Sequence, residues 1–413
     1  MKPGYKQTEV GIIPENWDVC TLGALGPFSK GQGIRKSEAT SGEIPCIRYG
    51  EIYTHHSDVV RFYNSHISAA VALTSKHLRK GDLLFAGSGE TKEEIGKCVA
   101  FVDDEDVYAG GDIVVLSPNA GSSVFFGYLL NAPPVANQKA SKGQGDAVVH
   151  ISSRALASVT IPFPPPPEQR AIATALSDVD GLLGGLDRLI AKKGDLKQAA
   201  MQQLLTGQTR LPGFHGEWEV KRLGDVGKFL KGSGVTKDQT RSGTLACVRY
   251  GELYTQHNDV VRDFHSWISP VVAATAVRLE QGDILFAGSG ETKEEIGKCA
   301  AFVSDVEAYG GGDIVILRPD DSDSVFLGYY LNTGSIARQK ASRGQGDAVV
   351  HISSSALSDV RCKLPPLPEQ TAIAEVLTEM DAELAGIEQR REKTRALKQA
   401  MMQELLTGKT RLI

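Results

Sequence analysis

The sequence has no long uninterrupted run of apolar residues and no pair of cysteines at C-x-x-C spacing. The first absence excludes a membrane-spanning helix, which needs about 20 consecutive apolar residues. The N-terminal stretch MKPGYKQTEV also lacks the apolar segment of a secretory signal. The 6 cysteines are scattered through 413 residues, so we expect free thiols and no zinc site. These absences predict a cytoplasmic protein without a metal centre.

The sequence also has no excess of basic residues over acidic ones. The chain has 45 Lys and Arg against 50 Asp and Glu, a formal net charge of −5. Such a balance argues on average against a nucleic-acid partner, although it does not describe local patches. Hydrophobic content of 41% and charged content of 23% are those of a globular protein. The length is enough for two or three domains.

The glycine-rich and charged segment FAGSGETKEEIGKC, at Phe85–Cys98, invites comparison with nucleotide-binding loops. A Walker loop requires Gly, four residues, Gly-Lys and then Ser or Thr. Here the Gly-Lys pair is followed by Cys98, and the position for the first glycine holds Thr91. The Gly-Ser-Gly turn is not followed by the apolar helix of a dinucleotide or adenosylmethionine site. We therefore expect no cofactor.

The same fourteen residues return at Phe286–Cys299, and an offset of 201 residues holds along the whole chain. It relates Arg48–Glu51 to Arg249–Glu252 and Gly143–Ile151 to Gly344–Ile352, with no insertion between these anchors. The end of the chain matches the start of the second copy. This closure predicts two units related by a pseudo-two-fold axis rather than an open array.

The first part of each unit, which we call a head, has the composition of a compact mixed α/β domain. Val99–Val102 and Asp112–Leu116 are expected to be strands, because they are short apolar runs bounded by turn residues. Val124–Leu130 fits either a short helix or a buried strand.

A proline-rich connector follows each head, IPFPPPPEQ in the first unit and KLPPLPEQ in the second. Apolar residues then recur three and four positions apart without proline, which predicts a helix of roughly 37 residues and about 55 Å. At this length, occurring twice, an antiparallel coiled-coil pair is favoured over a core helix. The first helix contains Gly181, Gly184, Gly185 and Gly194, which we expect to allow close approach of the second.

The predicted fold is therefore mixed α+β, with two pseudo-two-fold-related α/β heads separated by two long antiparallel coiled-coil helices. We expect the heads at residues 1–163 and 208–364, and the helical segments at residues 164–207 and 365–413.

Pro-Pro-x-Pro-Glu-Gln followed by a long helix ending in Leu-Leu-Thr-Gly occurs at Pro164–Gly207 and again at Pro365–Gly408, and Trp17 and Trp218 open the two heads. With two heads alternating with two such helices, the whole chain resembles the specificity subunit of type I restriction–modification systems. The resemblance implies two target-recognition domains that read double-stranded DNA. It implies helices that set the spacing of the half-sites and dock a pair of methyltransferase subunits and the restriction subunits. Catalysis would then lie in these partners, and the chain has no Asn/Asp-Pro-Pro-aromatic motif for adenine methylation.

The identical blocks predict that both heads read the same or closely related bases, so that the full target is an interrupted inverted repeat. Within these blocks Arg48 and Arg249 suit guanine, the glutamines suit adenine and the carboxylates suit cytosine. The basic cluster of Lys139, Lys142, Lys340 and Arg343 suits phosphates. The predicted DNA-contacting residues are Arg48, Tyr49, Glu51, Ser88, Glu90, Thr91, Lys92, Lys139, Lys142 and Gln144, with Arg249, Tyr250, Glu252, Ser289, Glu291, Thr292, Lys293, Lys340, Arg343 and Gln345 in the second unit. His150, between two β-branched residues, is expected to be buried.

Alternatives remain open at this point. Arg48 fits an internal ion pair with Glu51 as well as it fits a guanine contact. A coiled-coil adaptor that binds protein rather than DNA, or an enzyme that uses the Gly-Ser-Gly turn for a nucleotide, would also account for parts of the sequence.

Overall fold

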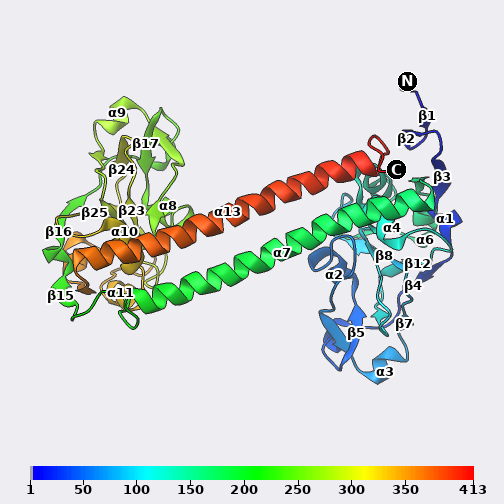
Figure 1. Cartoon of the computed structure of the whole chain (residues 1–413), viewed down its shortest axis with the longest axis horizontal. Coiled ribbons are helices and arrows are strands. Elements are labelled where there is room, and N and C mark those ends of the chain that lie inside the picture. The colour runs from blue at the N-terminus through cyan, green and yellow to red at the C-terminus, as the bar shows by residue number, and fades with distance from the viewer. Residues whose placement is uncertain (1–2) are drawn as a thin grey trace. The chain divides into compact units, whose positions relative to one another are not determined.

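The computed structural model describes residues 3–413, which divide into two compact units (Figure 1). Unit 1 holds the residues through Asp187 together with Gln389–Ile413, and unit 2 holds Arg188–Glu388. Each unit therefore combines one head, the first half of the long helix that follows it and the second half of the other long helix. The 201-residue offset relates the elements of one unit to those of the other. The predicted mixed α/β fold with two repeated heads is confirmed.

The head of unit 1 is built on two four-stranded sheets, in the orders β10-β8-β12-β4 and β6-β5-β11-β7. Leu83 and Phe85 of β8 pack toward helix α4, whereas Leu84 and Ala86 pack into a second core on the opposite face. Both faces of this strand are buried, which explains its continuous apolar sequence. The elements are β1 (Tyr5–Thr8), β2 (Gly11–Pro14), β3 (Asp18–Thr21), α1 (Leu22–Leu25), β4 (Phe28–Lys30), β5 (Ile44–Ile47), α2 (Tyr49–Thr54), β6 (Ser65–Ile67), α3 (Ala69–Ala72), β7 (Lys76–His77), β8 (Leu83–Ala86), β9 (Ser88–Gly89), β10 (Cys98–Ala100), β11 (Tyr108–Ala109), β12 (Ile113–Leu116), α4 (Ser123–Asn131), α5 (Pro133–Ala140), β13 (Val149–His150), α6 (Ser153–Ala157) and β14 (Thr160–Phe163).

The head of unit 2 repeats this plan, with sheets in the orders β16-β25-β21-β23-β18 and β19-β17-β24-β20. Its elements are β15 (Glu219–Arg222), β16 (Gly227–Lys231), β17 (Leu245–Val248), α8 (Tyr250–Thr255), β18 (Val260–Val261), β19 (Ser266–Ile268), α9 (Pro270–Ala273), β20 (Val277–Arg278), β21 (Ile284–Ala287), β22 (Ser289–Gly290), β23 (Cys299–Phe302), β24 (Ala308–Gly310), β25 (Ile314–Pro319), α10 (Ser324–Tyr330), α11 (Gly334–Ala341), β26 (Val350–His351), α12 (Ser354–Ser358) and β27 (Arg361–Leu364). The predicted strands are confirmed as β10 and β12 and their copies. The ambiguous segment at 124–130 is helical, as α4.

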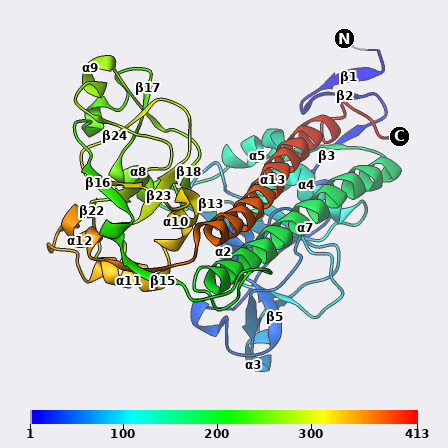
Figure 2. The same cartoon turned by 60° about the vertical axis from the view of Figure 1, so that its left-hand side comes forward.

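The long helices are α7 (Pro166–Leu204) and α13 (Leu367–Leu405), of 39 residues each. That length corresponds to about 58 Å. Within unit 1 the first half of α7 lies beside the second half of α13 (Figure 2), and the ion pairs Asp187–Arg391 and Asp180–Lys398 join them. Residue numbers rise along one helix as they fall along the other, so the pairing is antiparallel, as predicted.

The expected role of Gly181, Gly185 and Gly194 in α7 is wrong. A Cβ atom added at Gly181, Gly185 or Gly194 would meet no other described atom within 4 Å. These glycines face open space and do not bring a partner helix closer.

The end of each long helix is anchored on a head. In unit 1, Leu405 and Leu406 join the core that contains Trp17, and Arg411 pairs with the buried carboxylate of Glu168. In unit 2 the segment after α7 does the same, with Arg210 on Glu369. Among residues 3–413, no helix is long and apolar enough to cross a membrane.

Candidate nucleic-acid interface

Three of the repeated sequence blocks meet on one part of each head. In unit 1, the hydroxyl of Tyr53 on α2 donates to the Ser88 carbonyl oxygen at 3.1 Å. Strand β9 pairs with β13, placing His150 opposite Ser88, and the backbone of His150 exchanges hydrogen bonds of 2.9 and 2.7 Å with Gln144. We call Arg48–Tyr49, Ser88–Lys92 and Lys142–His150 the recognition surface of unit 1, and residues 249–250, 289–293 and 343–351 that of unit 2.

The guanidinium of Arg48 keeps donors available at this surface. Its side chain is 28% exposed, and Nη2 lies 3.9 Å from Glu51 Oε1, which is longer than a hydrogen bond. Arg249 is 27% exposed, and it is Nε, buried without a hydrogen-bond partner, that lies 3.8 Å from Glu252 Oε1. The carboxylate therefore orients the arginine without occupying its hydrogen-bonding groups, so the ion pair and a DNA contact are compatible.

Glu51 and Glu252 do not fit their predicted role as base-contacting residues. They are only 2% and 4% exposed. Glu51 accepts from the Arg48 backbone N–H at 2.9 Å and from the Ser65 hydroxyl at 2.5 Å. Both carboxylate oxygens are thus engaged in capping helix α2 and holding the neighbouring strand, and Glu252 has the same two kinds of partner.

Lys139 and Lys340 also require correction, because each is 2% exposed. Their Nζ atoms donate to the backbone carbonyls of Gly96 and Gly297 at 2.5 and 2.6 Å. Burial lowers the pKa of Lys139 to about 8 and lowers the pKa of Lys340. These ammonium groups are buried in their heads and are not positioned for phosphate. Of the other predicted lysines and Arg343, Lys92 and Lys293 are exposed, whereas Lys142 and Arg343 are half-buried. The guanidinium of Arg343 donates to the backbone carbonyls of Gln339 and Asp359.

Ser88 and Ser289, predicted to contact DNA, are 4% and 2% exposed. Each hydroxyl is hydrogen-bonded to Nδ1 of a histidine, Ser88 to His150 at 2.9 Å and Ser289 to His351 at 2.8 Å. The serines therefore act inside the head. Of the predicted residues, Tyr49, Glu90, Thr91, Lys92 and Gln144 are exposed, as are their copies Tyr250, Glu291, Thr292, Lys293 and Gln345.

The prediction that His150 is buried is wrong. Val149 and Ile151 are 2% and 4% exposed, while His150 between them is exposed. Neighbouring residues of an extended segment point to opposite faces, so anchoring both flanking residues in the core turns the histidine outward. The alternation of Val, His and Ile in the sequence contained this signal.

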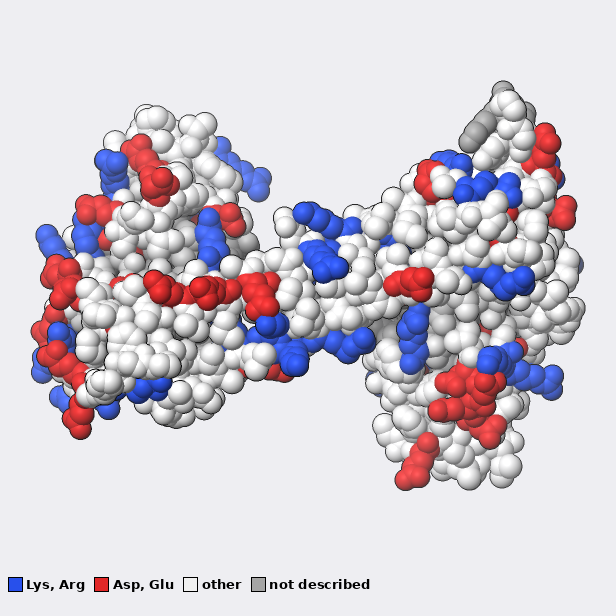
Figure 3. All heavy atoms as spheres, in the orientation of Figure 1, with Lys and Arg blue, Asp and Glu red and all other residues white. Residues whose placement is uncertain are grey.

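The surface charge of the protein is mixed. Figure 3 shows Lys and Arg interspersed with Asp and Glu over the face drawn, without a continuous basic area. The recognition surface itself combines Arg48, Lys92 and Lys142 with Glu90 and Asp146. Its chemistry suits hydrogen bonding to base edges more than attraction to a phosphate backbone.

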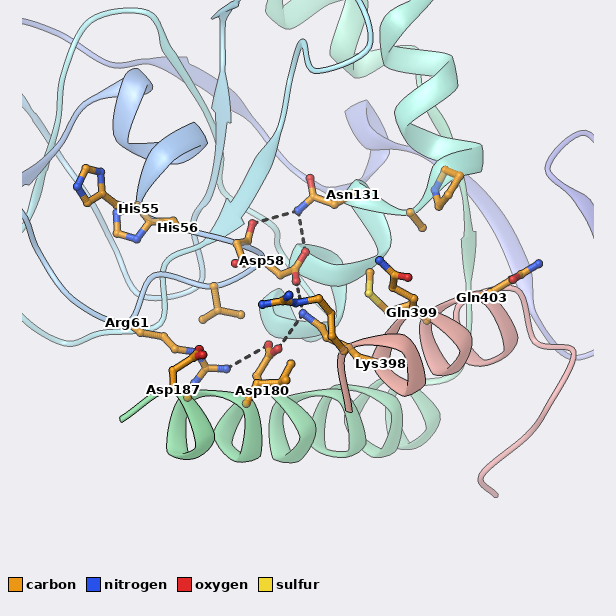
Figure 4. Close-up of a pocket in the computed structure, with 18 of the residues that line it drawn as sticks. His55, His56, Asp58, Arg61, Asn131, Asp180, Asp187, Lys398, Gln399 and Gln403 are labelled. Carbon is orange, nitrogen blue, oxygen red and sulfur yellow. Dashed lines mark hydrogen bonds and ion pairs between the residues drawn. The ribbon is translucent and has the colours of Figure 1, made fainter. Parts of the chain in front are cut away.

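A second feature of unit 1 is a groove of about 1100 Å³ between the head and the helix pair (Figure 4). In it, Lys398 Nζ lies 2.8 Å from both Asp58 and Asp180. Asn131 Nδ2 donates to Asp58 at 3.0 Å, and Arg61 lies 3.6 Å from Asp180. These polar contacts fix the head on the helices.

The corresponding groove of unit 2 is smaller, about 360 Å³. There Lys197 and Arg262 lie 2.5 and 3.0 Å from Asp381. Among the described residues, no carboxylate other than Asp381 lies within ion-pair distance of Lys197, whereas its equivalent Lys398 bridges two.

Comparison with known proteins gives consistent matches along the chain. A family model described as "Type I restriction modification DNA specificity domain" matches residues 14–189 and again residues 215–395. The MjaVIII type I restriction enzyme specificity subunit of Methanocaldococcus jannaschii is 23% identical over 430 residues, covering 99% of this chain and 96% of that protein. The putative MjaX specificity subunit of the same organism is 25% identical, covering 99% and 97%. The crystal structure of the S subunit of a type I restriction–modification system from M. genitalium has the same fold, with a TM-score of 0.61 at 15% identity and coverage of 98% and 99%.

Proposed function

The chain belongs to the type I restriction–modification DNA specificity family, and from this premise we propose that each of its heads, residues 1–163 and 208–364, reads one half of a bipartite DNA target. Specificity subunits supply recognition and no catalysis, so modification and cleavage belong to partner subunits. The observation that carries the proposal is the repeated recognition surface. Its exposed residues Tyr49, Glu90, Thr91, Lys92 and Gln144 are identical in unit 2.

Identical side chains on identical scaffolds favour identical hydrogen-bonding partners. Arg48 and Arg249 present guanidinium donors suited to guanine, and Gln144 and Gln345 present amides suited to adenine. We further propose a pseudo-two-fold relation between the two copies, as the repeat in the sequence predicts, so that the two half-sites run in opposite directions. The proposed target is an inverted repeat interrupted by bases that the chain does not read.

Both the net charge of the chain and the groove of unit 1 support a role for partner subunits. A net charge of −5 provides little counterion release, so the methyltransferase subunits are proposed to make most of the phosphate contacts. The groove in unit 1 is lined by Phe62, His55, Pro133 and Met402 beside Arg395 and Lys409. Phe62 is 51% exposed, and an exposed aromatic residue in a groove is a typical anchor for a protein partner. Docking beside the long helices is therefore proposed here.

The test is to map DNA methylation by long-read sequencing in cells that produce this chain with its methyltransferase partner. An inverted repeat with a fixed gap is the expected motif. Unrelated halves would refute shared specificity but keep the family role. Absence of any modified motif, together with failure of the purified complex to retain duplex DNA, would instead support the protein-binding adaptor.

A matched pair of variants links the motif to the surface. Changing Gln144→Ala should relax the motif in one half-site, and Gln345→Ala should relax it in the other. As a control, Gln138→Ala alters a glutamine of the same head that bonds to the backbone of Thr160, and it should leave the motif unchanged. Relaxation by the control, or none by the test variants, would contradict the assignment.

A further inference from the structure

A histidine is held in a fixed orientation at the centre of each recognition surface. His150 stands directly opposite Ser88 across the β9–β13 pair, and directly opposite residues of antiparallel strands place their side chains on the same face. Ser88 lies beneath, 4% exposed, and binds Nδ1 at 2.9 Å. His351 and Ser289 repeat the pair at 2.8 Å. The imidazole is therefore oriented by its inner nitrogen.

The outer nitrogen of each imidazole is Nε2. Both histidines are exposed, and within residues 3–413 the only hydrogen bond of either ring joins Nδ1 to the serine hydroxyl. When the serine hydroxyl donates to Nδ1, Nε2 carries the proton, because the bond at one ring nitrogen determines the state of the other. In that tautomer the imidazole presents an oriented N–H donor that no described residue uses.

A second polar side chain stands beside this donor. Gln144 pairs with the other edge of His150 through an isolated antiparallel bridge, so Gln144, His150 and Ser88 form one row across this bridge and the two-stranded β9–β13 sheet. The row is held from both sides, because Val149 is buried in the core and the Ile151 N–H donates to the Gly87 carbonyl at 3.0 Å. The amide and the imidazole are thus neighbours on one rigid face.

We propose that His150 and His351 are DNA-contacting residues. Each donates a hydrogen bond from Nε2 to an acceptor group on its half-site, and this acceptor lies beside the group that Gln144 or Gln345 binds. The acceptor is a base-edge oxygen or nitrogen, or a phosphate oxygen, and these share the chemistry that takes an N–H donor. Ser88 and Ser289 act as positioning residues. The inference rests on the proposed function, since it requires the recognition surface to face DNA.

The experiment uses the purified complex of the full chain with its methyltransferase subunits and a duplex that carries the mapped motif. His150→Ala and His150→Asn should each weaken binding about tenfold, the effect of one lost hydrogen bond to an ordered partner. His150→Gln should keep affinity within about threefold of the wild type, because its amide nitrogen replaces Nε2. Equal losses in all three variants, or no loss in any, would overturn the proposal.

A second duplex of scrambled sequence distinguishes a base-edge acceptor from a phosphate acceptor. Loss on the target duplex alone assigns a base edge. An equal loss on both duplexes assigns a phosphate. Either result supports the contact, whereas unchanged binding to both duplexes rejects it.

The positioning role is tested by a double-mutant cycle. Ser88→Ala should weaken target binding in the wild-type background and have no further effect in the His150→Ala background. Additive losses would reject positioning through His150.

If the wild-type complex fails to prefer its target, the proposed function fails. If the complex prefers its target and His150→Ala binds that target equally well, only this inference fails. Thermal unfolding of His150→Ala should match that of the wild type because the side chain is exposed.

Discussion

Replacing Lys398 with methionine should destabilise unit 1 far more than the equivalent change destabilises unit 2. Lys398 is 12% exposed and bridges Asp58 and Asp180, which are 9% and 15% exposed, at 2.8 Å each. Removing it leaves the nearly buried carboxylate of Asp58 without an ion-pair partner, at a cost of about 3 kcal/mol. The lower end of the usual range applies because Asp58 keeps the Asn131 amide at 3.0 Å and Asp180 keeps Arg61 at 3.6 Å.

The matched control is Lys197→Met. Asp381 is 22% exposed and keeps Arg262 at 3.0 Å and the Tyr329 hydroxyl at 2.6 Å. The remaining arginine still compensates the carboxylate, so the expected cost is about 1 kcal/mol. The same lysine-to-methionine change therefore has unequal effects in two related sites.

Hydrogen–deuterium exchange measures each unit by itself. For amides of α4 that exchange through opening of the whole unit, 3 kcal/mol corresponds to a loss of protection of more than about a hundredfold. For amides of α10 in Lys197→Met, about a fivefold loss is expected. Equal effects in the two units would refute the reasoning.

Further predictions concern other parts of the heads. Gly145→Ala should lower target affinity at least about tenfold with little change in unfolding temperature, since φ is +114° and the added Cβ would lie 2.1 Å from the Val148 carbonyl oxygen; unchanged binding in a gel-shift assay would contradict this. Arg411→Ala should destabilise unit 1 by about 3 kcal/mol in denaturant unfolding, because Glu168, 1% exposed, loses its ion-pair partner. Lys139 has a folded pKa of about 8, below its unfolded value of about 10.4, so the folded state releases its proton first. The stability of unit 1 should therefore rise with pH between these values, and Lys139→Met should remove the rise in unit 1 but not the contribution of Lys340 in unit 2; a flat wild-type profile for unit 1 would exclude it.

The large-scale organisation was predictable because it depends on repeated, redundant signals. Each long helix is specified by more than ten turns of periodic apolar residues without proline, and the 201-residue offset is supported by many identical positions. A few atypical residues, such as the glycines of α7, do not change the result. Their expected role failed because spacing along a helix does not say which face meets a neighbour.

The fine structure of the recognition surface was less predictable, since burial depends on contacts between segments far apart in sequence. The buried Lys139 is hydrogen-bonded to the carbonyl of Gly96, and the buried Glu51 is hydrogen-bonded to the hydroxyl of Ser65. A polar residue in an identical block looks the same in the sequence whether it faces solvent or supports the fold. His150 is the opposite case. The alternation of Val, His and Ile indicated an exposed histidine, but the apolar character of the two neighbours led to the prediction that it is buried.

The pattern of difference between the units separates two roles of the chain. The exposed residues of the recognition surface are the same in both heads, whereas the groove beside the helices has diverged. Phe62 in the groove of unit 1 corresponds to Asp263 in unit 2, and Arg395 corresponds to Gly194. Since the duplication began from one sequence, retention at one surface and divergence at another indicate different requirements. Recognition of two identical half-sites requires identical surfaces. The docking proposed for the grooves tolerates unequal affinities, as long as a partner subunit occupies each groove in the assembled complex. The first partner subunit is then expected to dock on the larger, aromatic groove of unit 1, because burying Phe62 adds hydrophobic free energy that Asp263 cannot provide.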